Sequence, residues 1–456
     1  MDFGPLIALP GIVALIVIWL GSTEKAFLYV YLPVLLLLPN YFYFGRPPLN
    51  FAQYAIIPIA VAVCWRIVNG GWKWSALDAF VVGFVMWNFM SDFHANGLND
   101  VFQRIALPLT LALFPYMIGK TIIEQRGVRV LFMRRFVFCL VLDSIISTYE
   151  VRMGQNPART FLLQFIQTTA WPGTVREGWI RAAGPFGHAI LMGTIIGIAI
   201  ILTRYISYLG LWEPNFRWLP SFPVSKEKLM LFILIGGLLL TQSRGPWIAT
   251  IVGVALASCG TSALYKPRFK KVALLLLVGG FFLFLAARAY LAQGPGGPVS
   301  EEQRSAAYRT ELIDRYQDIA LREKLWGWGS NTWPKIRAMP SVDNAYLLMT
   351  LMYGVTGLIL YGLMLTVSFT RLIRRALSPQ ELPASERAML FVLFGIGVSV
   401  ALSTATVFLG EQLYPLLFLL LGWIEACLAR DPQDGPALDQ LVMLDWQPKY
   451  RFPVVS

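Results

Sequence analysis

Charged residues are scarce in this chain, and their scarcity sets its class. Of 456 residues only 14% are charged, whereas 56% are hydrophobic and the mean hydropathy is +0.59. A soluble domain of this size needs more polar surface than such a composition supplies. The composition therefore excludes an ordinary soluble protein and predicts a polytopic membrane protein whose apolar runs cross the bilayer as helices.

Cysteine and histidine are also rare, with four and two residues respectively. All four cysteines fall inside apolar runs, where a thiol behaves as a small hydrophobic side chain. Their positions favour neither a disulfide framework nor a metal-binding motif.

Thirteen apolar runs have the character of membrane spans, and twelve is the alternative count because two of them are short. The first follows Asp2 rather than a basic stretch and has no small-x-small cleavage pattern, so we expect it to be retained. The runs are 6–20, 27–38, 51–65, 77–90, 101–118, 131–146, 185–202, 229–240, 247–264, 272–290, 345–369, 388–407 and 414–428.

The basic residues predict how these runs are oriented. A net charge of +12 would suggest nucleic acid in a soluble protein, but in a membrane protein basic loops first mark the cytoplasmic side. If 266–271 and 371–387 are cytoplasmic, alternation places the 241–247 segment outside, together with the long connections 149–184 and 291–342. On that side we count 13 arginines but only two lysines.

This excess of arginine predicts an anionic ligand on the outer side. Arginine binds phosphate or carboxylate bidentately and stays charged, whereas lysine offers only a point charge. The alternative is that these arginines are solvated or contact lipid headgroups.

The runs and loops divide the chain into six segments. They are N-terminal transmembrane helices (1–148), a first periplasmic loop (149–184), central transmembrane helices (185–290), a large periplasmic loop (291–342), C-terminal transmembrane helices (343–428) and a cytoplasmic tail (429–456).

Ser243-Arg244-Gly245-Pro246-Trp247 lies between two apolar runs. An arginine beside hydrocarbon is costly, so its presence needs an explanation. We expect Gly245 and Pro246 to break the helix and to bring the Arg244 guanidinium to the membrane surface. Arg244 would then form one wall of an anion-binding site.

A second candidate segment precedes the seventh run and contains Arg181, Gly184, Pro185, Gly187 and His188. Its glycines allow a close approach of the backbone, and a helix start presents free N–H groups to an anion. Arg181 and His188 flank this start. The alternative is an ordinary interfacial turn in which His188 only satisfies the backbone.

The large outer loop predicts a helix over 300–325, with Ser300 and Gln303 as a capping box. At 100° per residue, Arg304, Arg315 and Arg322 lie on one solvated face, where Glu311 can pair with Arg315.

Arg309 is predicted on the opposite face of this helix, among Leu312, Ile313, Tyr316 and Ile319. A buried charge needs a partner, so we expect Arg309 to be functional. The alternative is a structural ion pair with Asp92, Asp100 or Glu411.

Asp343 and Asn344 precede the eleventh run. Capping of the helix would explain both residues. The functional interpretation is that Asp343 is a carboxylate opposite the arginines, able to orient or deprotonate a sugar hydroxyl.

These motifs together resemble the O-antigen ligase/polymerase superfamily of bacterial glycan transferases. The resemblance rests on four motifs in order: Arg181-x-x-Gly184-x-Phe186-Gly187-His188; Ser243-Arg244-Gly245-x-Trp247; Tyr308-Arg309 before Gly327-x-Gly329; and Asp343-Asn344-x-Tyr346-Leu347 before Tyr353-Gly354-x-x-Gly357.

The resemblance implies an all-α, GT-C-like transmembrane bundle in the bacterial inner membrane, with its active site facing the periplasm. It implies a metal-independent, inverting glycosyltransferase without a cofactor, whose donor glycan is linked to undecaprenyl diphosphate. Family arginines fall on Arg244 and Arg309, with Arg181 as a further candidate, and would hold the diphosphate. With Asp343 acting on the acceptor hydroxyl, we expect Arg244, Arg309 and Asp343 to be catalytic and Arg181, His188 and Asn344 to bind substrate. The outer loops offer no Asp-x-Asp pair or histidine cluster for Mg²⁺ or Mn²⁺, in agreement with this scheme.

One departure from the family pattern is informative. The ligases typically carry His-Asn where this chain has Asp343-Asn344. We therefore favour an exopolysaccharide or O-antigen polymerase, with a ligase that transfers glycan to lipid A core as the alternative. Expected partners are the lipid-linked glycan, a glycan or lipid A core acceptor, membrane lipids and other polysaccharide export proteins, but not nucleic acid.

Two readings from other classes stay open. A transporter or flippase could use the arginines to attract an anionic substrate, although transporters place polar groups at the midplane and often show repeated halves. A non-enzymatic scaffold would leave Arg309 unexplained.

Overall fold

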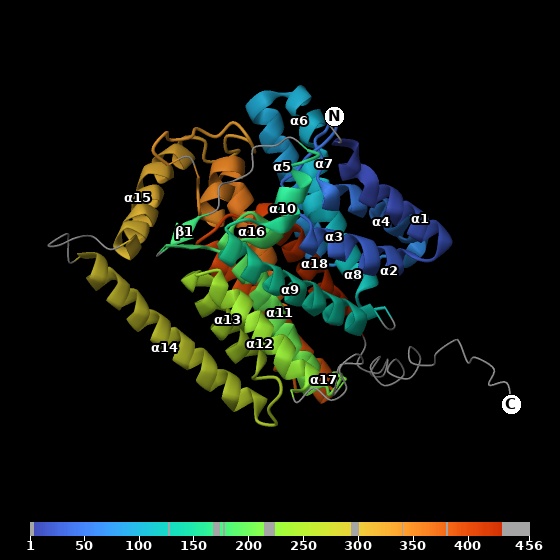
Figure 1. Cartoon of the computed structure of the whole chain (residues 1–456), viewed down its shortest axis with the longest axis vertical. Helices are drawn as coiled ribbons and strands as arrows, with labels where there is room; N and C mark the ends of the chain where they lie inside the picture. The colour runs from blue at the N-terminus through green and yellow to red at the C-terminus, as the bar shows by residue number, and fades with distance from the viewer. Residues whose placement is uncertain are drawn as a thin grey trace.

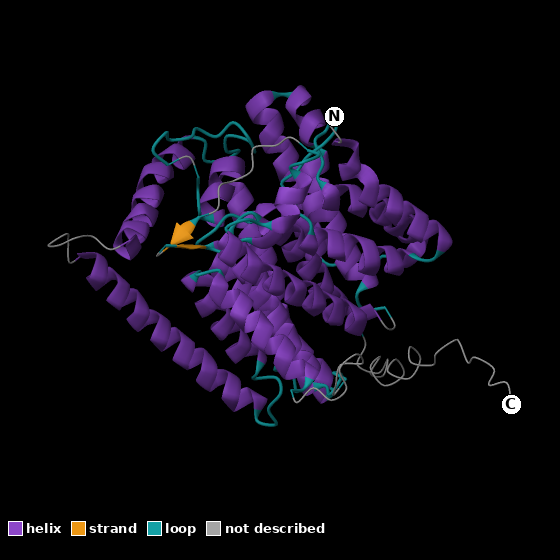
Figure 2. Cartoon of the chain, in the orientation of Figure 1, coloured by secondary structure: helices purple, strands orange, loops and turns teal. Residues whose placement is uncertain are grey.

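Helices form nearly all regular structure in the part of the chain that the computed structural model describes, which is residues 4–125, 128–166, 174–176, 178–213, 224–292, 301–339, 341–379 and 382–430. Within those ranges the only sheet is an antiparallel pair of two-residue strands, β1 (Val175–Arg176) and β2 (Trp179–Ile180) (Figure 2). The predicted all-α polytopic bundle is confirmed.

Eight of the described helical segments, rather than thirteen, are long and apolar enough to cross a membrane. Each of the thirteen predicted runs contains helix, although some extend beyond it. The run at 27–38 is divided into short pieces, α9 carries several charged residues, and α12 has only 15 residues. The eight are Phe51–Gly70, Ala76–Asn96, Val101–Ile122, Ala189–Tyr208, Tyr265–Ala286, Ala345–Ala376, Ala384–Thr404 and Gly410–Ala429.

The N-terminal helices form one flank of the bundle, shown in blue and cyan (Figure 1). Side-chain caps fix two of the longer ones, because Asn50 with Gln53 and Ser75 with Asp78 form capping boxes. The elements are η1 (Gly4–Ala8), α1 (Leu9–Leu20), α2 (Thr23–Ala26), η2 (Phe27–Tyr31), α3 (Leu32–Leu37), α4 (Phe51–Arg66), η3 (Ile67–Gly71), α5 (Ala76–Asn96), α6 (Leu98–Arg104), α7 (Ala106–Pro108), η4 (Leu109–Leu113) and α8 (Phe114–Ile122).

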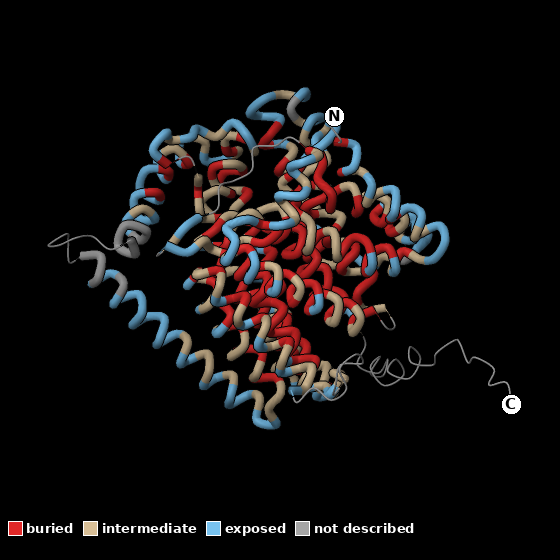
Figure 3. Tube along the Cα trace, in the orientation of Figure 1, coloured by how far each residue is buried: buried red, intermediate tan, exposed pale blue. Residues whose placement is uncertain are grey.

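The central helix of the bundle is α11, in which nearly every residue is buried (Figure 3). Its Gly193 and Gly197 lie against Pro246 and Thr250 of α13, so these two helices approach closely. The central elements are α9 (Val128–Met153), α10 (Pro157–Leu162), η5 (Gly184–Phe186), α11 (Ala189–Tyr208), α12 (Lys226–Leu240), α13 (Arg244–Ala257) and α14 (Tyr265–Ala292).

Helix α14 lies apart from the bundle along most of its length (Figures 1 and 3). None of the described side chains in its apolar stretch is buried. Such a surface suits contact with lipid.

The C-terminal helices are α15 (Glu301–Arg322), α16 (Ala345–Ala376), α17 (Ala384–Thr404) and α18 (Gly410–Ala429). Helix α16 is interrupted at Gly354, which has φ 68°. The turn after α15 packs against this break, where the N–H groups of Trp328 and Gly329 donate to the carbonyls of Leu351 and Met352 at 2.9 and 3.0 Å. A break within a membrane span is tolerated when its backbone groups are paired in this way.

The two ends of the bundle are marked by different contacts. At one end the buried Arg129 pairs with Glu124 and Glu386, and the Tyr205 hydroxyl at the end of α11 donates to the carbonyl of Ser385 at 3.0 Å. At the other end α11 begins, and the Ala345 N–H donates to the carbonyl of Val407 at 3.1 Å. We call this second end the site end.

Candidate anion-binding site at the site end of the bundle

The hinge between α12 and α13 is a non-helical stretch of three residues, 241–243. Gln242 has φ 48°, the one positive φ outside glycine in the described chain. The expectation that Gly245 and Pro246 break the helix is therefore wrong. Both lie in the first turn of α13, where proline costs no hydrogen bond. Arg244 is the first residue of α13 and is exposed.

The β1–β2 hairpin binds the carbonyl groups of this hinge. Arg181 donates from Nε to the carbonyl of Thr241 at 3.1 Å and from Nη2 to the Ser243 hydroxyl at 2.6 Å. Arg176 donates to the carbonyl of Gln242 at 3.1 Å. Cations at the end of a helix satisfy its unpaired carbonyls and its dipole. Arg181 therefore holds the hinge in place.

Burial, together with the positive charges of Arg176 and Arg309, lowers the pKa of Arg181 to about 10 against the opposing effect of the Asp343 carboxylate. The guanidinium group of Arg181 therefore remains charged at neutral pH. The groups whose charges act on it are Arg176, Arg309 and Asp343.

His188 is the N-cap of α11, and its Nδ1 accepts a hydrogen bond from the Ile190 N–H at 3.2 Å. His188 therefore does satisfy a backbone N–H group, as the alternative prediction stated. Because Nδ1 is the acceptor, the neutral ring carries its proton on Nε2 and can donate from there. Burial lowers the pKa of His188, Asp343 raises it, and Arg181 and Arg309 lower it.

Helix α15 has the predicted apolar face and the predicted solvated face, although not every residue lies where it was expected. Leu312, Tyr316 and Ala320 are buried against the residues that precede and begin α16. On the solvated side Glu311 and Arg315 form the expected ion pair at 2.5 Å, and both are about half exposed.

Arg309 is exposed rather than buried, so its predicted position among the core residues is wrong. The helix packs along a narrow stripe, which leaves Ile313 43% exposed and Arg309 at the edge. Partial burial still lowers the pKa of Arg309; Asp343 raises it and Arg176 lowers it. Its head group therefore shares the surroundings of Arg181.

The alternative partners that we considered for Arg309 are engaged elsewhere or lie outside the described residues. Asp92 accepts from the backbone N–H and hydroxyl of Ser330, and Glu411 accepts from Asn50. Outside the described parts lie the side chain of Asp100, the capping pair Ser300 and Gln303, and the side chain of Arg304.

Asn344, not Asp343, caps α16. Its Oδ1 accepts from the N–H groups of Tyr346 and Leu347 at 3.0 and 3.1 Å. Asp343 instead accepts from the Ser341 hydroxyl at 2.8 Å, and the Tyr308 hydroxyl of α15 donates to the Ser341 carbonyl at 3.3 Å. Capping explains Asn344, but it leaves Asp343 without a structural explanation.

Arg181, His188, Arg309 and Asp343 are electrostatically coupled at the site end of the bundle. The Asp343 charge acts on the pKa of each of the other three. Arg244 follows Ser243, the hydroxyl that Arg181 binds. Arg176 belongs to the same site but was not predicted from the sequence. The feature that could have indicated it is its position five residues before Arg181; it pairs with Trp179 across the hairpin. Three arginines around one carboxylate favour an anion.

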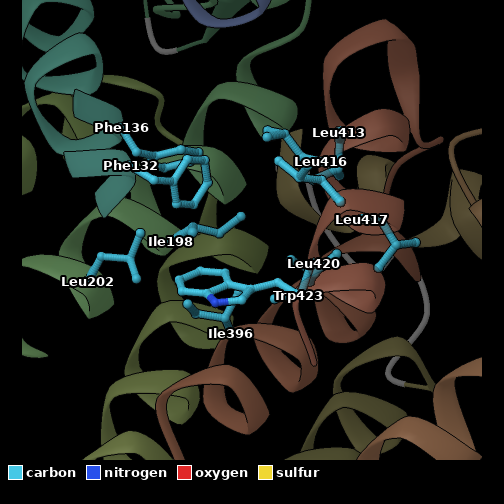
Figure 4. Close-up of a pocket in the computed structure, with 12 residues that line it drawn as sticks. Phe132, Phe136, Ile198, Leu202, Ile396, Leu413, Leu416, Leu417, Leu420 and Trp423 are labelled. Carbon is cyan, nitrogen blue, oxygen red and sulfur yellow. The ribbon is translucent and has the colours of Figure 1, made fainter. Parts of the chain in front are cut away.

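The cavity inside the bundle is unsuited to such a ligand. It measures about 30 Å³, and its walls are leucine, isoleucine, valine and aromatic side chains (Figure 4). The indole N–H of Trp423, which lies at this wall, donates to Glu124 at 2.6 Å. The space would hold about one water molecule and offers it no free polar group.

Comparison with known proteins supports the assignment of family. Residues 229–362 match the family described as O-antigen ligase. This range includes Arg244, Arg309, Asp343 and Asn344, but neither Arg181 nor His188. No curated protein matches the chain. Residues 229–362, less than a third of the chain, are thus similar to the O-antigen ligase family, and eight of the described helical segments are long and apolar enough to cross a membrane.

Proposed function

We propose that this protein is a glycosyltransferase that transfers or polymerises a glycan carried on undecaprenyl diphosphate, with the site end facing the periplasm. The observation that carries the proposal is the meeting of Arg181, Arg309 and Asp343 from three separate segments. A diphosphate is an anion that guanidinium groups bind bidentately.

In this mechanism the anomeric C–O bond to the diphosphate breaks as the acceptor hydroxyl attacks. Negative charge develops on the leaving diphosphate, and Arg309 and Arg244 stabilise it from fixed positions. Asp343 takes the proton of the acceptor hydroxyl, while the Nε2–H of His188 donates to a substrate oxygen. Arg181 holds the hinge from which Arg244 projects. Attack from the face opposite the diphosphate inverts the anomeric configuration.

We favour polymerisation over transfer to lipid A core, because a carboxylate stands where the ligases typically carry histidine. A transporter of an anionic substrate is the alternative from another class. The clustering of these charges at one end, rather than at mid-height in broken helices, favours the transferase.

A deletion strain and a reconstituted assay test this proposal together. The full-length protein in proteoliposomes should lengthen an undecaprenyl-diphosphate-linked oligosaccharide, and deletion should remove long-chain polysaccharide. Polymer stranded on its carrier beside bare lipid A core would indicate the ligase instead. Normal polysaccharide in the deletion strain, with no product in the proteoliposomes, would contradict both forms of the proposal.

A further inference from the structure

A second cavity opens at the site end, between the end of α5, α6, α7, the start of α16, the start of α18 and the turn after α15. Its volume is about 220 Å³, below the roughly 300–1,000 Å³ of pockets for drug-sized ligands. Polar side chains reach it in the midst of leucine and methionine: Asn88, Asp92, Arg104, Glu411 and Tyr414.

Two of these polar side chains lack hydrogen bonds. Asn88 is 1% exposed, and neither its amide nitrogen nor its amide oxygen has a partner within the described chain. The Tyr414 hydroxyl is also buried and lies close enough to the Asn88 amide for the two side chains to interact, but their contact falls short of a full hydrogen bond. Unpaired buried groups cost about 1–3 kcal/mol each, so native structures rarely keep them without a reason. A ligand that both donates and accepts hydrogen bonds would satisfy them.

The two carboxylates at the cavity are held in fixed positions. Asp92 accepts from the Ser330 N–H at 2.7 Å and from its hydroxyl at 3.1 Å. Glu411 accepts from the Asn50 amide at 3.4 Å. Fixed carboxylate oxygens can accept further hydrogen bonds from hydroxyl groups, whereas they repel a phosphate. With two carboxylates and one guanidinium, that of Arg104, at its walls, the cavity favours a neutral ligand over a second diphosphate.

A neutral sugar ring fits this combination of groups. Its hydroxyls both donate and accept, which matches the amide, the phenol and the carboxylates. Its C–H faces suit the apolar walls around Met349, Met352 and Leu348. An acyl chain would leave Asn88 and Tyr414 unpaired, so a lipid tail is disfavoured.

The cavity shares residues with the surroundings of the anion-binding site. Ala345 at its wall follows the Asn344 cap and is two residues from Asp343. Phe408 at its wall packs edge-on against the His188 ring, with centroids 6.1 Å apart. We infer that the cavity binds a neutral sugar residue of the acceptor glycan beside Asp343; only the assignment to the acceptor rests on the proposed function.

Saturation-transfer NMR on the full-length protein tests this inference directly. The protein would be held in a detergent without a sugar headgroup, and the probes would be the methyl pyranosides of glucose, galactose and mannose. At least one probe should receive saturation from the wild type, and the signal should fall at least five-fold in the double variant Asn88→Leu with Tyr414→Phe. The melting temperature should not fall, because the substitutions remove no full hydrogen bond to the described part of the chain.

Two controls make the result interpretable. Tyr414→Phe alone removes a single oxygen atom and should weaken the signal even where the double variant folds poorly. Arg315→Ala lies outside both the cavity and the anion-binding site and should keep the signal. No signal from the wild type, or full signal from the folded double variant, would overturn the inference. Sugar binding by a protein without transferase activity would instead contradict the proposed function and leave the sugar cavity supported.

Discussion

Arg181 forms two hydrogen bonds with the hinge: Nε donates to the carbonyl oxygen of Thr241 at 3.1 Å, and Nη2 donates to the hydroxyl of Ser243 at 2.6 Å. Two short motifs that lie about 60 residues apart are thereby joined into one structural unit. This contact fixes the start of α13, from which Arg244 projects.

Arg181→Lys should therefore lose both activity and stability, because lysine keeps the charge but cannot form the paired hydrogen bonds. Hydrogen bonds to charged groups contribute about 1.5–3 kcal/mol, so we expect at least a ten-fold loss of polymer formation and a lower melting temperature. Arg176→Lys loses one hydrogen bond and should show a smaller effect. A lysine variant with wild-type activity and melting temperature would show that Arg181 is not a hinge clamp.

Gly327 should tolerate no side chain, since a Cβ there would collide with the backbone of Gly354 and Met352. Gly178 offers a matched control, because it has a similar positive φ but open space around its Cβ position. Gly327→Ala should lower the melting temperature well beyond the backbone strain of about 1–3 kcal/mol that both variants share. Equal destabilisation of the two variants would mean that the turn after α15 can move away from α16 to make room for a side chain at position 327.

Stability should depend on the protonation of His188. Its pKa in the folded protein lies below the ordinary value of about 6.5, because burial and the charges of Arg181 and Arg309 outweigh Asp343. Its contribution is therefore fully present above about pH 6.5 and is lost as the pH falls through the folded pKa. His188→Asn keeps an acceptor for the Ile190 N–H but cannot titrate. Between pH 7.5 and pH 5 the melting temperature should fall less in this variant than in the wild type. An equal fall in both proteins would show that the protonation of His188 does not affect stability.

The arginines of α15 should differ in their tolerance of alanine. Arg309 shares the field of Asp343, whereas Arg315 forms an exposed pair with Glu311 that is worth about 0–1 kcal/mol. Arg309→Ala should abolish most polymer formation, while Arg315→Ala and Arg322→Ala should keep it. We expect the same tolerance for Arg304. Equal activity of the Arg309 and Arg315 variants would remove Arg309 from the site.

Much of the fold and part of the site follow from sequence patterns alone. The apolar runs predicted the helices, and the 3.6-residue period predicted the buried stripe of α15. The period gives the direction of a face but not its width, so it could not show that Arg309 lies at the edge. Likewise, glutamine has no preference for positive φ, so the sequence could not show that the helical structure is interrupted at Gln242. Gly245 and Pro246, which usually interrupt helices, suggested the wrong position for this interruption.

Tertiary contacts account for the other differences. Asp343 and Asn344 are equally suitable caps, and only the geometry of the helix start assigns that part to Asn344. Arg176 lies in a strand of two residues, too short to produce a pattern. The glycines at 327 and 354 looked like separate motif positions, but they meet at the break in α16 because no side chain separates them.

The measurement that tests the account most directly compares Asp343→Asn with Asn344→Ala in the reconstituted polymerisation assay, alongside their melting temperatures. Asparagine at 343 can still accept from Ser341 and leaves the helix cap intact, but it cannot take a proton. We predict that Asp343→Asn loses about 10²–10⁴-fold in rate at an unchanged melting temperature. Asn344→Ala should lose about 0.5–2 kcal/mol of stability and keep its rate. Wild-type rate from the Asp343→Asn variant would contradict the assignment of Asp343 as the base.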